Sequence, residues 1–224
     1  MRLLGIDTTG NTLSAAVMEN GRTLSEFYID AGKKHSETLM PTVDGVLRAA
    51  GYGAADMDAF AVACGPGSFT GIRIGTAACA AMAHGAGKPV IAVNTLEVLI
   101  ENAGAEERPV CAAMDARRGE VYTMTKHNGR VLVAERAVPL TVLLDQLLPE
   151  EPVVFVGDAA ERFREEIAAH RPDSVFLPQQ FLLQHASSVC AAAEKIYVQG
   201  GLLKYDELEP HYLRESQAER LKKR

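Results

Sequence analysis

Two hairpins with the same plan decide the fold of this chain: LLGIDTTGNTLSAAVMENGR at residues 3–22 and PVCAAMDARRGEVYTMTKHNGR at residues 109–130. In each, an apolar run ends at an acid, Asp7 or Asp115, and a second run ends at Asn-Gly-Arg. Asn-Gly between alternating apolar residues is a strong signal for a tight β-hairpin. The acid, the Asn and the Gly all recur at an offset of 108 residues. This repetition predicts a duplicated fold.

The segments that flank the two hairpins repeat as well. Short apolar runs predict strands, and apolar residues three and four positions apart predict helices. In the first half we expect strands over 2–7, 12–18 and 24–29, a helix over 39–50 capped by Ser36, a strand over 59–64, a helix over 71–85, a strand over 90–93 and a helix from Thr95. In the second half we expect strands over 109–115, 120–126 and 131–138, a helix over 140–148, a strand over 153–156 and a helix from Ala159.

This order of elements predicts an α/β protein with two similar lobes. Each lobe is expected to hold a mixed sheet, in which an antiparallel meander of three strands is extended by parallel strands through crossover helices. We place the N-terminal lobe at residues 1–104 and the C-terminal lobe at residues 105–207, with the segment 208–224 packing on the first lobe.

The composition excludes several classes of protein. Apolar residues make up 47% of the 224 residues and charged residues 23%, so the chain is expected to fold. A net charge of −6 argues against a general nucleic-acid coat. An acid at position 7, and apolar runs far shorter than the roughly 20 residues of a membrane helix, predict a soluble cytoplasmic protein with no signal peptide. Four cysteines without a CxxC pair predict buried, reduced thiols.

The first hairpin carries polar groups in its turn. They are Asp7, Thr8, Thr9, Gly10, Asn11 and Thr12. Such a turn can direct backbone N–H groups and hydroxyls at a phosphate, and the acid can hold Mg²⁺ through water. The alternative is a hairpin that is merely rich in turn-forming residues.

A glycine-rich turn, GPGSFTG at residues 65–71, joins a predicted buried strand to a helix. Ile72 stands where a Walker A loop needs Lys, and Thr70 stands where the dinucleotide motif needs Gly, so neither phosphate motif is present. Ser68 or Thr70 is expected to cap the helix. Small residues then recur at Gly71, Gly75 and Cys79, which favours close helix packing, either within the lobe or with a partner protein.

The second hairpin has Ala116 and two arginines, Arg117 and Arg118, where the first has hydroxyls. This replacement predicts that the second hairpin has lost the groups of a phosphate site. The two arginines form either an anion site or a solvated turn. No two of the six histidines stand four residues apart, and neither GxSxG nor HExxH occurs. We therefore expect no catalytic residue and no metal site.

Five segments together resemble one family. They are LGIDTTGNTLSAAV at 4–17, KHSETLMPTVDGVL at 34–47, ACGPGSFTGIRIGTAACAAMA at 63–83, MDARRGEVYTM at 114–124 and PHYLRESQAE at 210–219. They span nearly the whole chain, and GPGSFTGIRIG with DARRGEVY is quite specific. The chain resembles the TsaB (YeaZ) family, in the superfamily of actin, sugar kinases and Hsp70 ATPases (ASKHA), which implies two ribonuclease H-like, actin-like ATPase lobes.

The resemblance also implies a function. Members of this family are non-catalytic subunits needed for N6-threonylcarbamoyladenosine formation at position 37 of ANN-decoding tRNAs. They bind the catalytic TsaD-like paralogue, which carries an HxxxH metal motif absent here, and a TsaE-like ATPase joins the pair. The resemblance implies no intrinsic cofactor, ATP or ADP with Mg²⁺ only in the complex, tRNA reached only through the complex, no membrane partner, and a homodimer of the free chain through the same surface.

Two groups of candidate residues follow from the motifs and the resemblance. The vestigial or interfacial nucleotide site comprises Asp7, Thr8, Thr9, Gly10 and Asn11. The loop and partner-binding residues are His35, Glu37, Leu39, Met40, Gly65, Pro66, Gly67, Ser68, Thr70, Gly71, Arg73, Gly75 and Cys79.

Three alternatives stay open. The two-lobed plan and the Asp7 hairpin also suit an active ATPase or small-molecule kinase. A peptidase with Ser68 as nucleophile is a further alternative, although nothing near Ser68 in the sequence marks a base. The basic segment 214–224, with five cations and two anions, is either a solvated helix end or a contact to tRNA phosphates.

Overall fold

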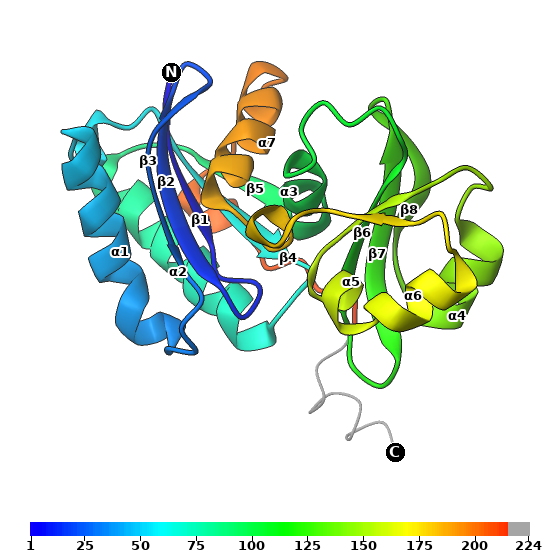
Figure 1. Ribbon diagram of the computed structural model, residues 1–224. Coiled ribbons are helices and arrows are strands. Elements are labelled where there is room, and N and C mark those ends of the chain that lie inside the picture. The colour runs from blue at the N-terminus through cyan, green and yellow to red at the C-terminus, as the bar shows by residue number, and fades with distance from the viewer. Residues whose placement is uncertain (215–224) are drawn as a thin grey trace.

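Two five-stranded mixed sheets form the core of the computed structural model, which describes residues 1–214 (Figure 1). The first sheet has the order β3-β2-β1-β4-β5. Its strands are β1 (Arg2–Asp7), β2 (Leu13–Glu19), β3 (Arg22–Ile29), β4 (Ala59–Gly65) and β5 (Val90–Asn94). The first three strands form an antiparallel meander, and β4 and β5 continue the sheet in parallel with β1.

The second sheet repeats this arrangement, with the order β8-β7-β6-β9-β10. Its strands are β6 (Val110–Asp115), β7 (Glu120–His127), β8 (Arg130–Pro139), β9 (Val154–Val156) and β10 (Val175–Phe176). Again an antiparallel meander is extended by parallel strands. The predicted fold class, two similar lobes with mixed sheets, is confirmed.

Both Asn-Gly turns have the predicted geometry. Asn20 and Gly21 have φ values of 49° and 77°, and Asn128 and Gly129 have 49° and 75°. Two consecutive positive φ angles define the type I′ turn, whose twist matches that of the strands it joins. Each turn therefore sets the register of its hairpin.

Most helices lie where they were expected. They are α1 (His35–Ala50), α2 (Phe69–Ala86), α3 (Thr95–Glu101), α4 (Leu140–Val142), α5 (Asp158–Arg162), α6 (Arg164–His170) and α7 (Ala186–Val198). Two details of the prediction are wrong. Helix α1 begins at His35 after Lys34, so Ser36 is not its cap, and the helix expected over 140–148 is one short turn followed by a π-helical turn at Leu143–Leu147.

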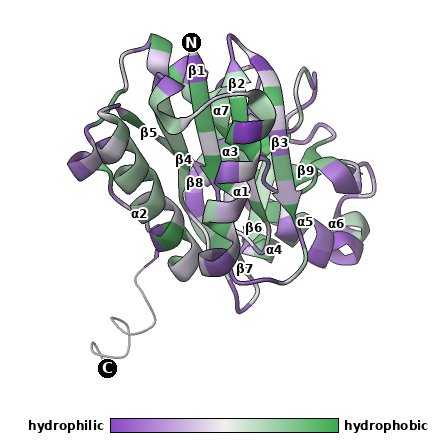
Figure 2. Cartoon of the chain, turned by 90° about the vertical axis from the view of Figure 1, so that its left-hand side faces the viewer, coloured by the Kyte–Doolittle hydropathy of each residue, from purple (hydrophilic) through white to green (hydrophobic). Residues whose placement is uncertain are grey.

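The helices form layers around the two sheets. Helices α1 and α2 pack on one face of the first sheet, whose apolar strands lie behind them in Figure 2. Helices α3 and α7 pack on the opposite face. Helix α3 also packs on the second sheet, since Val98 belongs to the core of the first sheet while Leu96 and Leu99 belong to the core of the second. The two lobes therefore share α3.

The chain crosses back to the first lobe before residue 207, which differs from the expected boundary. Helix α7 buries Ala186, Val189 and Cys190 against the first sheet, so residues 186–207 do not belong with residues 105–185. The segment after it contacts both lobes, because Leu208 packs on the core of the first and Leu213 on the core of the second. Most of the basic tail, residues 215–224, lies outside the described residues. Within residues 1–214, no helix has the length and apolarity needed to cross a bilayer.

Candidate functional site

The two hairpins and the glycine-rich turn meet in a cleft between the lobes. A cavity of about 340 Å³ lies there, and many of the residues singled out in the sequence line it. Its lining includes Thr9, Gly10, Asn11, Gly67, Ser68, Phe69, Thr70, Asp115, Ala116, Arg117, Tyr122 and Asp158. Both acid-bearing turns meet there because each follows the first strand of its sheet, and these two strands end at the same cleft.

The polar groups of the first hairpin are bonded to one another and to α2. The Thr9 amide and the Thr9 hydroxyl both donate to Asp7 Oδ1, each over 2.8 Å. The Thr8 hydroxyl donates to the Gly71 carbonyl oxygen over 2.7 Å. Asp7, Thr8 and Thr9 are all buried. The hydroxyls that the sequence offered to a phosphate are thus used inside the lobe.

The small residues of α2 pack closely against this hairpin. The Ser68 amide donates to the Thr9 carbonyl oxygen over 2.7 Å, and a Cβ placed on Gly71 would overlap the Thr8 carbonyl oxygen. Gly75 lies against the Thr8 side chain, and Cys79 is in the core below α1 and α2. The glycine stripe therefore serves packing within the lobe.

Six of the predicted loop and partner-binding residues are buried within the first lobe. They include Leu39, Gly71, Gly75 and Cys79, whose role in partner binding stays a prediction. Gly65 and Pro66 are buried too. Five of the candidates are exposed and remain available for a partner: Glu37, Met40, Ser68, Thr70 and Arg73.

Ser68 and His35 also have structural contacts within the lobe. The Ser68 hydroxyl accepts a hydrogen bond from the Gly71 amide over 3.3 Å, which confirms Ser68 as the cap of α2. His35 is half-buried, and its Nε2 lies 3.0 Å from the Gly10 carbonyl oxygen, so it links α1 to the tip of the first hairpin.

Burial sets the charge state of Asp7. Removal from water raises its pKa from 3.8 to about 7, and the two hydrogen bonds from Thr9 only partly oppose this. Its second oxygen, Oδ2, is buried without a hydrogen-bond partner among the described residues. Near neutral pH the carboxyl group therefore exists in both its protonated and ionised forms.

Asp7 is expected to make the folded state less stable as the pH rises. The folded chain keeps the Asp7 proton up to about pH 7 and the unfolded chain loses it near 3.8, so the destabilisation grows between these two values and is complete above 7. We expect the free energy of unfolding to fall by about 1–3 kcal/mol more between pH 5 and 7 in the wild-type chain than in Asp7→Asn. Urea titrations of both proteins across this range measure the difference, and equal pH slopes would contradict it.

The second hairpin holds its acid in a different way. Asp115 Oδ2 forms ion pairs with Arg162 and, over 3.6 Å, with Arg117, while Oδ1 accepts from the Arg117 amide over 2.8 Å. The backbone amide of Asp115 donates to Asp158 Oδ1 over 2.9 Å. Burial raises the pKa of Asp158. The Asp115 carboxylate, which would face a cation bound to a phosphate, is thus already paired with two arginines.

The residues present do not fit a magnesium nucleotide held as the superfamily resemblance would suggest. Such a site needs free hydroxyls in the first hairpin and a free carboxylate in the second. Here Thr8 donates to Gly71, Thr9 donates to Asp7, and Asp115 is paired with two arginines. Among residues 1–214, no group of three potential metal ligands lies together.

The sequence interpretation missed three residues of this region. The Gln184 side chain is buried against Gly10, where a Cβ would approach its Oε1 to 2.8 Å. Asp158 and Arg162 stand on α5, directly after the turn at Gly157, which matches the glycine-rich turn of the first lobe. The internal repeat predicts a helix after this turn but not which of its side chains contact Asp115, and no local pattern marks Gln184.

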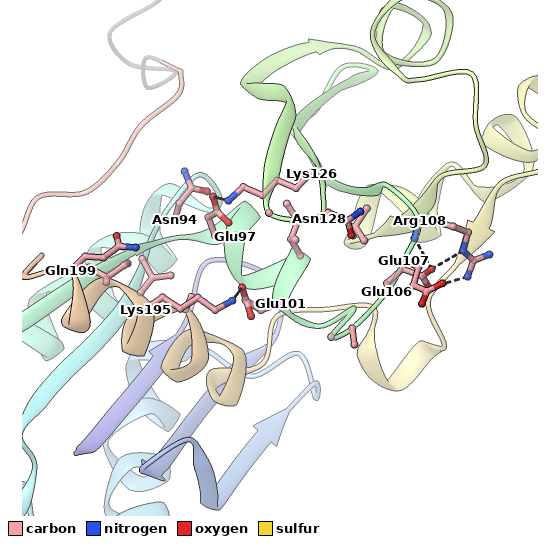
Figure 3. A pocket seen from close by; sticks show the side chains of 18 of the residues that line it. Asn94, Glu97, Glu101, Glu106, Glu107, Arg108, Lys126, Asn128, Lys195 and Gln199 are labelled. Carbon is pink, nitrogen blue, oxygen red and sulfur yellow. Dashed lines mark hydrogen bonds and ion pairs between the residues drawn. The ribbon is translucent and has the colours of Figure 1, made fainter.

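A larger cavity of about 870 Å³ lies between α3, α7 and the β7–β8 hairpin. Figure 3 shows its charged side chains beside one another. Glu97 pairs with Lys126, Glu101 pairs with Lys195, and Glu106 accepts two bonds from the Arg108 guanidinium over 2.8 and 2.9 Å. The first two pairs join α3 to the second sheet and to α7, and the three pairs together neutralise most of the charge in this cavity.

The four cysteines, Cys64, Cys79, Cys111 and Cys190, are buried and unpaired, as the sequence predicts. Burial raises the pKa of each thiol, to about 11 for Cys64. They act as small apolar residues of the cores.

Comparison with known proteins places this arrangement in a family. Residues 29–221 match the family model described as TsaD, tRNA N6-adenosine threonylcarbamoyltransferase. The chain is 34% identical over 162 residues to the tRNA threonylcarbamoyladenosine biosynthesis protein TsaB of Bacillus subtilis, an alignment that covers 70% of this chain and 71% of that one.

Solved structures agree with the sequence comparison. The structure of YeaZ from Pseudomonas aeruginosa superposes with a TM-score of 0.82 at 28% identity, covering 95% of this chain and 99% of that one. The activator of 2-hydroxyisocaproyl-CoA dehydratase from Clostridium difficile, solved with ADPNP, shares the fold at 11% identity, with a TM-score of 0.57 over 90% of this chain and 96% of that one. The chain therefore belongs to the TsaB (YeaZ) family of the superfamily of actin, sugar kinases and Hsp70 ATPases.

Proposed function

We propose that this chain is a non-catalytic subunit in the formation of N6-threonylcarbamoyladenosine at position 37 of ANN-decoding tRNAs. The name of its Bacillus relative supports the pathway. One observation supports the non-catalytic role: the polar groups of the cleft are already bonded within the chain. Thr8 and Thr9 donate hydrogen bonds within the first lobe, and Asp115 is paired with Arg162 and Arg117. A cleft bonded in this way is better suited to structural support than to phosphate chemistry.

In this proposal, the exposed face of α1 and the first turns of α2 bind a catalytic TsaD-like paralogue. The two helices lie side by side on the outer face of the first sheet. Met40 on α1 is a large apolar side chain that is 51% exposed, and Glu37 on α1 and Thr70 and Arg73 on α2 are exposed polar residues. Apolar and polar side chains occur together in protein–protein interfaces, and Met adapts well to a partner surface.

The remaining partners follow from the same proposal. A TsaE-like ATPase joins the pair, and ATP or ADP with Mg²⁺ binds only in the complex, since the isolated cleft does not fit it. The tRNA is reached through the complex, which agrees with a net charge of −6 for this chain. Without the paralogue, two copies of the chain would pair through α1 and α2.

Co-purification tests this function. The chain is mixed at micromolar concentration with the TsaD-like and TsaE-like proteins, with and without ATP and Mg²⁺, and resolved by size-exclusion chromatography with light scattering. We expect the paralogue to co-elute with the chain and the homodimer to disappear. Separate elution under all conditions would remove the proposal.

An active ATPase is the second candidate, because a cavity of about 340 Å³ does lie between the two acid-bearing hairpins. It requires the isolated chain to bind Mg-ATP. Calorimetric titration of the chain with Mg-ATP separates the two functions: saturable binding at micromolar nucleotide supports the ATPase, and the absence of heat supports the non-catalytic subunit.

A further inference from the structure

The last described residues, Pro210–Arg214, lie across the junction between the two lobes. They follow Leu208, which packs on the core of the first lobe, and they end beside the hairpin of Asp115 in the second. The proposed function assigns no role to these residues. Their contacts are specific and are divided between the two lobes.

On the first lobe, this segment contacts the glycine-rich turn. The His211 amide donates to the Cys64 carbonyl oxygen over 2.7 Å. The Tyr212 ring stacks on Phe69, the first residue of α2, with centroids 4.2 Å apart and planes 9° from parallel. Arg73 Nε donates to the Tyr212 hydroxyl over 2.9 Å. The first turn of α2 thus contacts both the ring face and the hydroxyl group of Tyr212.

On the second lobe, the same residues bind two strands and the hairpin. His211 Nε2 lies 3.0 Å from Glu135 Oε2 on β8, and the same oxygen accepts from Asn94 of the first lobe over 2.5 Å. Arg214 Nη1 donates to the Ala116 carbonyl oxygen over 2.7 Å, and its guanidinium pairs with Glu120. Leu213 packs into the core of the second sheet.

Residues 210–214 thus contact both walls of the cleft. Phe69 lines one wall and Ala116 the other, and the segment bonds to both. We propose that residues 210–214 act as a strap that sets how far the two lobes close over the cleft, with the Tyr212 stack as its releasable end. Helix α3 is packed on both sheets, so opening of the strap would turn the lobes about α3. This proposal shares Arg73 and the first turn of α2 with the proposed partner surface, but it requires no partner.

Hydrogen–deuterium exchange of the full-length chain tests the strap. In Tyr212→Ala, we expect amides of 66–72 and of 116–122 to exchange about two- to tenfold faster together, the factor that loss of one aromatic stack produces. Tyr212→Phe keeps the ring and loses only the bond from Arg73, so its increase should be smaller.

Tyr205→Ala is the matched control. Tyr205 also has its ring 4.2 Å from a ring of α2, that of His84, but this pair lies at the other end of the helix and within one lobe. Its removal should leave both cleft segments unchanged. The proposal is overturned if Tyr212→Ala behaves like Tyr205→Ala, if only residues 66–72 respond, or if β9 in the core accelerates equally, which would report general unfolding.

Discussion

Replacing Gly71 with alanine is expected to lower the free energy of unfolding by about 2–3 kcal/mol. The new Cβ would overlap the Thr8 carbonyl oxygen and lie 3.1 Å from the Thr8 carbonyl carbon. These are backbone atoms of a buried hairpin, so neither side can move without breaking the bond from the Thr8 hydroxyl to the Gly71 carbonyl. Overpacking of this kind typically costs about 1–3 kcal/mol, and the upper part of this range is expected because backbone meets backbone. Chemical denaturation of the purified variant measures the loss.

Gly85→Ala supplies the control in the same helix. A Cβ at Gly85 meets nothing within 4 Å, and the residue is exposed. Alanine is favoured over glycine inside a helix by about 0.5–1 kcal/mol, so this variant should be more stable than the wild type. If the two variants changed stability in the same direction, the close contact between α2 and the first hairpin would be contradicted.

Met40→Glu is expected to weaken binding of the TsaD-like paralogue at least about thirtyfold, which corresponds to about 2 kcal/mol. Docking would bury a carboxylate where the wild type buries a thioether, and an unpaired charge is costly to desolvate. Fluorescence titration or biolayer interferometry of the two purified proteins gives the dissociation constant.

Val131→Glu is the matched variant for this test. Val131 is 52% exposed and Met40 is 51% exposed, but Val131 lies on β8 of the second lobe, away from α1 and α2. It should leave the affinity within about twofold. Equal losses for Val131→Glu and Met40→Glu would place the partner elsewhere or show a non-specific effect of charge.

The two hairpins could be predicted because their signals are local. Asn20-Gly21 and Asn128-Gly129 adopt the positive φ angles that those residue types favour, and the repeat at 108 residues placed the same elements in both lobes. The capping role of Ser68 was also visible, because the cap and the amide it accepts from are three residues apart. Local geometry was therefore predictable, and the repeat extended it to the whole chain.

The remaining features depend on contacts that are distant in the sequence. Helix α7 packs through small residues, so that a Cβ on Gly5 would approach Cys190 Sγ to 2.5 Å, and its sequence gives little contrast between a buried and an exposed side. Gly71 and Gly75 face the interior of the lobe because they contact Thr8, which is more than 60 residues earlier in the sequence. Asp115 is paired with Arg162, which is also distant in the sequence. A spacing of four residues shows that small groups share one face, but it does not show what covers that face.

Reconstitution of tRNA modification tests the central claim most directly. The TsaD-like and TsaE-like proteins, threonylcarbamoyl donor, ATP and tRNA are combined with no chain, with the wild-type chain, with Asp7→Asn or with Met40→Glu, and N6-threonylcarbamoyladenosine is measured by mass spectrometry. If the chain acts as a non-catalytic partner, modification requires it, persists with Asp7→Asn and falls sharply with Met40→Glu. Loss of modification with Asp7→Asn, while that variant still binds the paralogue as the wild type does, would show that the cleft of this chain takes part in the chemistry and would contradict the account.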